Sequence, residues 1–269
     1  MRLALASGRE ATIQIDDQGV GPACFVLSAA RAGSTMLNEI VAGLARANNR
    51  HFIDLGTALF EASVPEDEYR HDPGLASAIR PGNAYGGFRL MPSVLTWNDL
   101  FVTGPKVLMV RDPRDMLVSR YFSDGWSHRM PQVDDPDGLT GQMERQRAQA
   151  REGTIDDFVL RRAGYVADAL MGYLPLLSSS TTVVLTYEDY VFDKRALIAR
   201  VADHYDWVAP PATIDHILSR VDVFPETAEP GAHIRQVHPG DHRSQLRADT
   251  VQRLNEVLAE VMAPYGYEV

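Results

Sequence analysis

Short apolar runs rich in β-branched residues alternate with longer stretches of helical periodicity along this chain. The runs are almost continuously apolar, which is typical of parallel strands covered by helices on both faces. The predicted strands are residues 24–28, 51–54, 85–90, 107–111 and 182–186. The alternation therefore predicts an α/β fold with a central parallel β-sheet flanked by helices.

The stretches between these runs carry helix signals such as capping Asp and Thr residues and an early proline. The predicted helices are residues 34–47, 113–122, 154–170, 193–205 and 249–262. Residues 123–153 and 224–247 are expected to be irregular, and the first of these segments is expected to cover a site. No linker divides the 269 residues, so we predict a single domain spanning residues 1–269.

The net charge excludes some kinds of binding partner. With 26 basic against 36 acidic residues the formal charge is −10, which argues against nucleic-acid binding and against attachment to an anionic membrane. Lys106 and Lys194 are the only lysines, so almost every basic residue is an arginine, which suits recognition of phosphate or sulfate. A lone Cys24 and the lack of a long apolar run lead us to expect a cytoplasmic protein.

The first predicted strand leads through a loop of small residues into a predicted helix. Backbone N–H groups at a helix N-terminus bind anions, and Gly33 permits close approach of a ligand to the backbone. Ser34 and Thr35 add hydroxyl donors, and Arg31 adds a positive charge. The phosphate loop of nucleotide triphosphatases needs a lysine and a first glycine that are missing here. An ordinary strand–helix turn is the alternative interpretation.

A second motif, Arg-Asp-Pro-Arg-Asp, starts at Arg111, where another predicted strand ends. Ligands of α/β sheets gather at the carboxyl ends of the strands. Ser119 follows eight residues later, two turns into the predicted helix, so both side chains are expected to approach one anion. A surface ion-pair network among the charged residues of 111–115 is the alternative.

Together, these motifs resemble those of the sulfotransferases that use 3′-phosphoadenosine 5′-phosphosulfate (PAPS). Residues 28–37 resemble the loop that binds the 5′-phosphosulfate, and residues 111–119 resemble the 3′-phosphate motif. Residues 186–189 resemble the segment whose tyrosine approaches the adenine. Residues 233–243 resemble the late loop that closes over the 3′-phosphate.

The resemblance implies a P-loop-like sulfotransferase fold, PAPS as co-substrate, 3′-phosphoadenosine 5′-phosphate (PAP) as product and no metal. The acceptor it implies is a hydroxyl or amine of a small molecule. Cofactor-binding residues implied by the resemblance are Arg31, Ala32, Gly33, Ser34, Thr35, Met36, Arg111, Ser119, Tyr187, Arg235, Gln236 and Val237. The chain departs from the family at Met36, where an aromatic residue is usual, and at Gln236 and His242, where lysine and tryptophan are common.

Five residues are candidates for the catalytic chemistry. Arg31 is predicted to stabilise the charge that grows on the leaving phosphate. His128 is the leading general base, because histidine titrates near neutral pH, and Asp54 is the alternative, with Glu61 after it. Arg89 lies at the end of a predicted strand, in the region where relatives carry a catalytic or sulfate-contacting residue.

Two other classes of function remain open from the sequence. A phosphate-loop kinase would need ATP and magnesium, and the missing loop lysine counts against it. A non-catalytic module that binds PAP or another nucleotide would keep the motifs without turnover. The acceptor pocket is expected from residues 55–85 and 123–153, and nothing in the sequence indicates the oligomeric state.

Overall fold

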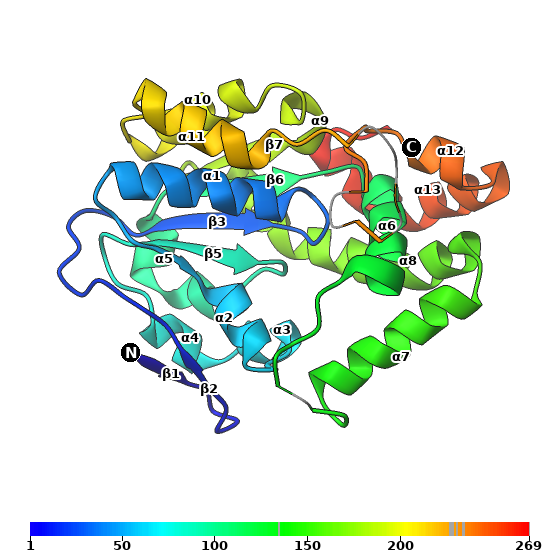
Figure 1. Ribbon diagram of the computed structural model, residues 1–269, viewed down its shortest axis with the longest axis horizontal. Helices are drawn as coiled ribbons and strands as arrows, with labels where there is room; N and C mark the ends of the chain where they lie inside the picture. The colour runs from blue at the N-terminus through cyan, green and yellow to red at the C-terminus, as the bar shows by residue number, and fades with distance from the viewer. Residues whose placement is uncertain (134, 226–228, 230, 233–234, 269) are drawn as a thin grey trace.

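The computed structural model describes residues 1–268 except 134, 226–228, 230, 233 and 234. Its centre is a five-stranded, all-parallel sheet in the order β4-β5-β3-β6-β7 (Figure 1). The strands are β3 (Cys24–Ser28), β4 (Phe52–Asp54), β5 (Ala84–Phe88), β6 (Lys106–Val110) and β7 (Thr182–Thr186). The predicted fold class, an α/β domain built on a parallel sheet, is confirmed.

Alternate residues of the central strands serve two separate cores. In β3, Cys24 and Val26 pack on one face of the sheet, whereas Phe25 and Leu27 pack on the other. All five β3 residues are buried, and so are all five of Lys106–Val110. Burial on both faces is why these strands are almost continuously apolar in sequence.

Helices cover both faces of the sheet. One face carries α1 (Ser34–Ala47), α10 (Lys194–Tyr205) and α11 (Pro211–Val221), which lie above the sheet in Figure 1. On the other face, α8 (Ile155–Tyr173) packs against α6 (Pro113–Phe122) and α13 (Ala248–Met262). No helix among the described residues combines the length and the apolarity needed to cross a bilayer.

Shorter elements complete the chain around this frame. An antiparallel hairpin, β1 (Arg2–Ala4) with β2 (Glu10–Thr12), packs beside α4 and α2. The remaining short elements are α2 (Leu55–Glu61), α3 (Glu66–Tyr69), α4 (Pro73–Ser77), η1 (Ser93–Trp97), α5 (Asp99–Thr103), η3 (Leu174–Ser178), α9 (Tyr187–Tyr190), α12 (His242–Gln245) and η4 (Ala263–Tyr265).

The expectation that residues 123–153 are irregular is wrong. This segment begins with a π-helical turn, η2 (Ser123–Ser127), and ends with the 14-residue helix α7 (Leu139–Glu152). Only Thr140, Gly141 and Ala150 of α7 are buried, so the helix carries no apolar stripe that would reveal it in the sequence. In the second segment expected to be irregular, the described part contains the one-turn helix α12.

Candidate active site

The two sequence motifs lie side by side at the carboxyl edge of the sheet. Strands β3 and β6 are parallel neighbours, so the loops that follow Ser28 and Val110 leave the sheet together. Arg111 Nη1 donates to the backbone oxygen of Arg31 at 3.4 Å, which joins the loops directly. The two motifs therefore meet at one edge of the sheet.

The first loop leaves the N-terminus of α1 open. Gly33 caps the helix with φ 91°, no side chain caps the first turn, and that turn contains no acidic residue. The first N–H groups of a helix have no partner within it, so they are available to an anion here. A Cβ at Gly33 would lie 2.9 Å from the Tyr187 ring, which explains why the loop has a glycine at this position.

Arg31 points from this loop toward α6. Its φ of 74° lies in the left-handed region, which is strained for an arginine. Nε donates to Ser119 Oγ and Nη1 donates to Ser123 Oγ, both at 3.1 Å. Burial lowers the pKa of Arg31 to about 10, with a further lowering by neighbouring arginines that Asp124 opposes. The guanidinium is still charged at pH 7, and an anion beside it would offset the cost of burying that charge.

Arg111 is buried at the start of the second motif. Its guanidinium lies over the Tyr187 ring at 4.4 Å, and its Nη2 is 3.7 Å from Asp115 Oδ2. Its Nε has no hydrogen-bond partner among the described residues. Because an unsatisfied buried donor is costly, this atom fits a ligand oxygen that the protein itself does not supply.

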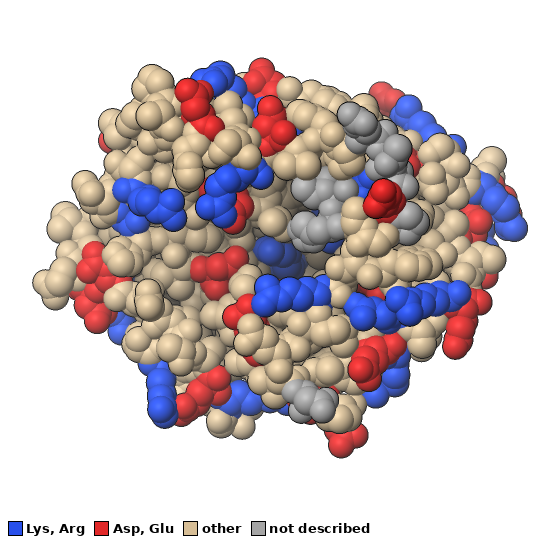
Figure 2. Space-filling model, viewed as in Figure 1, with Lys and Arg blue, Asp and Glu red and all other residues tan. Residues whose placement is uncertain are grey.

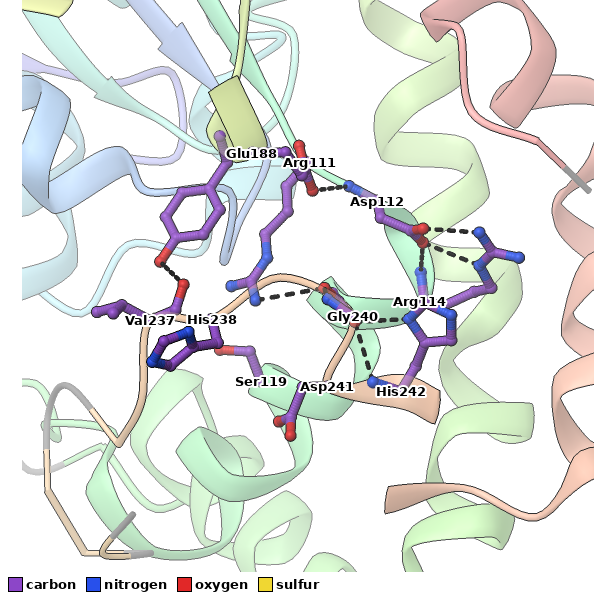
Figure 3. Close-up of polar contacts among 12 residues, drawn as sticks. Arg111, Asp112, Arg114, Ser119, Glu188, Val237, His238, Gly240, Asp241 and His242 are labelled. Carbon is purple, nitrogen blue, oxygen red and sulfur yellow. Dashed lines mark hydrogen bonds and ion pairs between the residues drawn. The ribbon is translucent and has the colours of Figure 1, made fainter. Parts of the chain in front are cut away.

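The other charges of this motif hold the structure together. Arg114 pairs with Asp112 at 2.7 Å and also donates to Asn255 Oδ1 on α13. Glu188 accepts the N–H of Asp112 at 2.9 Å (Figure 3). The motif is thus a buried network rather than the surface network that the sequence left open.

The late loop is tied to α6 through Asp115. This carboxylate accepts the N–H groups of Gly240 and His242 and the ring Nδ1 of His242, at 2.6, 3.0 and 2.6 Å. Burial opposes it, but these hydrogen bonds and the charge of Arg111 together lower the pKa of Asp115. His242, at the position where the family commonly has tryptophan, is therefore an anchor of the loop (Figure 3).

Further contacts position the rest of the late loop. Tyr187 donates from its hydroxyl to the backbone oxygen of Val237 at 3.0 Å. Arg235 forms an ion pair with Asp241 and lies over the Phe122 ring at 4.1 Å. Gln236 Oε1 accepts a backbone N–H within the same loop. Residues 233 and 234 of the predicted loop lie outside the described residues.

These elements enclose a first cavity of about 360 Å³. Of the twelve predicted cofactor-binding residues, Ala32 is buried behind the loop and the others line this cavity. The residues concerned are Arg31, Gly33, Ser34, Thr35, Met36, Arg111, Ser119, Tyr187, Arg235, Gln236 and Val237. Lys194 also lines it, although neither motif includes this residue.

A second cavity of about 570 Å³ adjoins the first. Both are lined by Arg31, Ser34, Thr35 and Ser123, so the cavities meet at the first loop. Figure 2 shows the molecule hollowed on this face, with basic side chains at the floor of the hollow. The two cavities give the site room for two ligands with a common boundary.

His128 and Arg89 line the second cavity. The His128 ring is 5.9 Å from the Phe60 ring, and its Nδ1 is 3.8 Å from Asp124 Oδ1. The side chain is 43% exposed, although the surrounding residues still shield the ring from much of the solvent. Burial lowers the pKa of His128 to about 4, and nearby arginines add to this effect against the charge of Asp124. The imidazole is thus neutral at pH 7 and can accept a proton.

The alternative carboxylates lie elsewhere. Asp54 caps α2 by accepting the N–H of Thr57 at 2.8 Å, and its other oxygen accepts from Asn38 at 3.1 Å. Glu61 pairs with Arg129 at 3.1 Å. Neither Asp54 nor Glu61 lines either cavity.

Comparison with known proteins supports the resemblance found in the motifs. The profile of the sulfotransferase domain matches residues 22–266. The chain belongs to the sulfotransferase family. The matched span contains every predicted site residue of this sulfotransferase and leaves the β1–β2 hairpin outside. No curated protein matches the sequence.

Solved structures share the fold at low sequence identity. A mouse sulfotransferase complexed with PAP has a TM-score of 0.61 and 13% identity, over 91% of this chain and 85% of that one. Retinol dehydratase with androsterone and PAP has a TM-score of 0.53 and 18% identity, over 95% and 84% of the two chains. Retinol dehydratase with retinol and PAP has a TM-score of 0.50 and 14% identity, over 98% and 89%.

Sequence reasoning missed Glu66, an acidic residue that lines the second cavity of this sulfotransferase. Glu66 Oε1 accepts the N–H groups of Arg89 and Leu90 at 2.6 and 2.8 Å, immediately after β5. Burial raises the pKa of Glu66 to about 7, although these hydrogen bonds oppose the rise. In sequence, Glu66 belongs to the three acidic residues that open α3, a pattern that any helix start can have.

Proposed function

We propose that this protein transfers the sulfuryl group of PAPS to a hydroxyl or amine of a small acceptor and releases PAP. The observation that carries the proposal is the boundary shared by the two cavities, at Arg31, Ser34, Thr35 and Ser123. A donor in the first cavity and an acceptor in the second would meet at this boundary, as group transfer requires.

The first cavity is suited to a donor with two anionic ends. The open N-terminus of α1, with Ser34 and Thr35, would bind the 5′-phosphosulfate. Arg111, Ser119 and Arg235 would bind the 3′-phosphate, and the unpartnered Nε of Arg111 supports this assignment. The structural relatives were crystallised with PAP, which supports the same donor.

In the proposed reaction the acceptor oxygen or nitrogen forms a bond to sulfur while the bond from sulfur to the phosphate oxygen breaks. Arg31 would stabilise the negative charge that develops on the phosphate. Its hydrogen bonds to Ser119 and Ser123 fix the guanidinium before the ligands arrive. Such preorganisation avoids a cost of reorientation during the transfer.

His128 is the proton acceptor in this proposal. It is neutral at pH 7, it lines the acceptor cavity, and its backbone N–H donates to the oxygen of Ser123 at 2.8 Å, beside the shared boundary. The pKa of Glu66 matches working pH better, but its Oε1 already accepts two backbone N–H groups at the end of β5. Position therefore favours His128.

The experiment is a titration followed by turnover. Calorimetry with PAP, PAPS and ATP, with and without magnesium, separates a sulfotransferase from a kinase. Tight PAP binding that does not need magnesium is expected, and a preference for magnesium–ATP would contradict the proposal. Incubation with PAPS and a panel of alcohols and amines then measures PAP release, which a module that only binds nucleotide would not show.

A further inference from the structure

The second cavity has walls from segments that are far apart in sequence. Residues of α2, α3 and the turn between them line it, as do residues near the ends of β5 and α6. Helix α7 contributes Gln142, Met143, Gln146 and Arg147, which recur with helical spacing and so share one face. Helix α8 contributes Arg162 and Tyr165.

Arginines dominate the charge of this cavity, although the whole chain is acidic. The cavity is lined by Arg31, Arg89, Arg120, Arg129, Arg147 and Arg162, against Glu66, Asp67 and Asp124. The chain as a whole carries −10. A positive cavity in an acidic protein attracts and concentrates anions.

Besides Arg31, which donates to two serines, three of these arginines lack a carboxylate partner among the described residues. Arg120 pairs with Asp124 at 3.2 Å, whereas Arg89, Arg147 and Arg162 form no ion pair with any described residue. Among the described residues, the Nε of Arg147 is also buried without a hydrogen-bond partner, although Nη2 of the same guanidinium donates to the backbone oxygen of His128. These guanidiniums have donors available for a ligand that enters the cavity.

Placing these cations together has an electrostatic cost. Burial lowers the pKa of Arg162, and the charge of Arg120 lowers it further. The pKa of Arg31 is likewise lowered by burial and then by other arginines, among them Arg89. A bound anion would relieve this repulsion, whereas a neutral ligand would leave it in place.

The cavity also has apolar walls. Phe60, Val64, Leu139 and Met143 line it beside the arginines. A ligand that satisfies both parts has an apolar body and an anionic group, and the hydroxyl to be sulfated must reach the boundary near Ser123.

We infer that the sulfate acceptor of this enzyme is a small hydroxy acid, whose carboxylate is bound by the unpaired arginines of the second cavity, Arg147 and Arg162 foremost. The inference rests on the proposed function and narrows it from alcohols in general to alcohols or phenols with a carboxylate. The carboxylate would also hold the acceptor in one orientation, because arginine binds it through paired N–H groups.

The test compares acceptors that differ only in charge. ω-(4-Hydroxyphenyl)alkanoates of two to five side-chain carbons are titrated into the PAP-bound protein by calorimetry, beside the corresponding primary amides. At least one carboxylate is expected to bind about tenfold or more tightly than its amide, because charge-assisted hydrogen bonds exceed neutral ones. Equal affinity within every pair, or no binding by any carboxylate, would overturn the inference.

Variants identify the residues responsible. Arg147→Gln and Arg162→Gln should each reduce the preference for carboxylate over amide severalfold, and the double variant should abolish it. Arg145→Gln is the matched control, because Arg145 is exposed on α7 and does not line the cavity. A preference that survives in the double variant would contradict the assignment to these arginines.

Failure of this inference can be told apart from failure of the proposed function. If the protein binds PAP and sulfates neutral phenols as well as the acids, the proposed function stands and the hydroxy-acid inference is wrong. If PAP does not bind, or PAPS is not consumed with any acceptor, the proposed function itself is wrong. Rates with both acceptor series at saturating PAPS give this distinction.

Discussion

The two cavities differ in how they are built, although they share Arg31. The first follows from the sheet: the loops after β3 and β6 lie side by side because those strands pair in parallel. The second depends on helices and loops outside the sheet, including α7, whose packing is mainly against η2. The shape of a site at a sheet edge is determined by how the strands pair. The shape of a site lined by loops and outlying helices can vary, and the ligand it binds can vary with it.

The two cavities also differ in how their arginines are paired with carboxylates. In the first cavity the arginines are partly neutralised, since Arg111 approaches Asp115 and Arg235 pairs with Asp241. In the second cavity Arg147 and Arg162 have no such partner among the described residues. Arg111 and Arg235 of the first cavity are thus held by the protein's own carboxylates. In the second cavity, Arg147 and Arg162 are left to a ligand, so we expect its specificity to depend on these few side chains.

Arg31 lines both cavities, so we expect it to act on the group that passes between them. Arg31→Ala should lower the rate of sulfuryl transfer by about 10²- to 10³-fold, the usual effect of removing a preorganised donor to a developing charge. Single-turnover kinetics with bound PAPS measure this rate. Arg46→Ala, an exposed arginine at the other end of α1, is the control and should retain the rate. Full activity in a folded Arg31→Ala variant would remove the assumed link between the cavities.

His128 tests whether the second cavity supplies chemistry as well as specificity. His128→Ala should lower the chemical rate by about 10²-fold, the lower end for general-base catalysis. Because the pKa of His128 is lowered to about 4, the neutral base predominates above that value. The wild-type rate should therefore be level from pH 6 to 8 and fall as the pH approaches 4.

Glu66 is the alternative general base if His128 does not serve. The pKa of Glu66 is raised to about 7, so a carboxylate base there would make the rate climb through neutral pH. A pH profile with its rise near 7, together with an unchanged rate in His128→Ala, would transfer the role of base to Glu66.

The sequence could predict the strands and the first loop beside the first cavity because each of these parts is local in sequence. Strands β3 and β7 were predicted at the observed residues, and β6 ends one residue earlier than expected, at Val110. Strands that are buried on both faces are almost continuously apolar, so they can be recognised in the sequence. Gly33 could be placed in the turn before a helix because strand, turn and helix are consecutive in the sequence.

The second cavity could not be predicted in the same way. Helix α7 buries only three of its residues and has no continuous apolar face, so it lacks the periodicity by which helices are detected. Arg89, Arg147 and Arg162 are separated by up to about 70 residues in sequence, and only tertiary packing brings them to one cavity. The raised pKa of Glu66 likewise results from burial, which acidic residues in a helix start do not announce.

Arg111 tests whether the first cavity recognises the 3′-phosphate. Arg111→Ala should weaken PAP by about tenfold or more relative to adenosine 5′-monophosphate, which lacks the 3′-phosphate, because a charge-assisted bond contributes about 1.5–3 kcal/mol. Calorimetry with both nucleotides gives the ratio. Binding of a hydroxy acid in the second cavity should change much less. An equal loss for the two nucleotides would show that Arg111 does not contact the 3′-phosphate.

Glu66 yields the smallest effect, on stability rather than on rate. Its folded pKa of about 7 exceeds the ordinary value of 4.5 for a glutamate, so its contribution to stability is complete below pH 4.5 and is lost as the pH rises through 7. Glu66→Gln should therefore raise the free energy of unfolding by about 1 kcal/mol at pH 8 and by little at pH 5. Urea unfolding at the two pH values measures the difference, with Asp67→Asn as the exposed control on the same turn. If Glu66→Gln raises the free energy of unfolding no more at pH 8 than at pH 5, burying the charged Glu66 carboxylate has no cost. The second cavity would then penalise only its buried arginines.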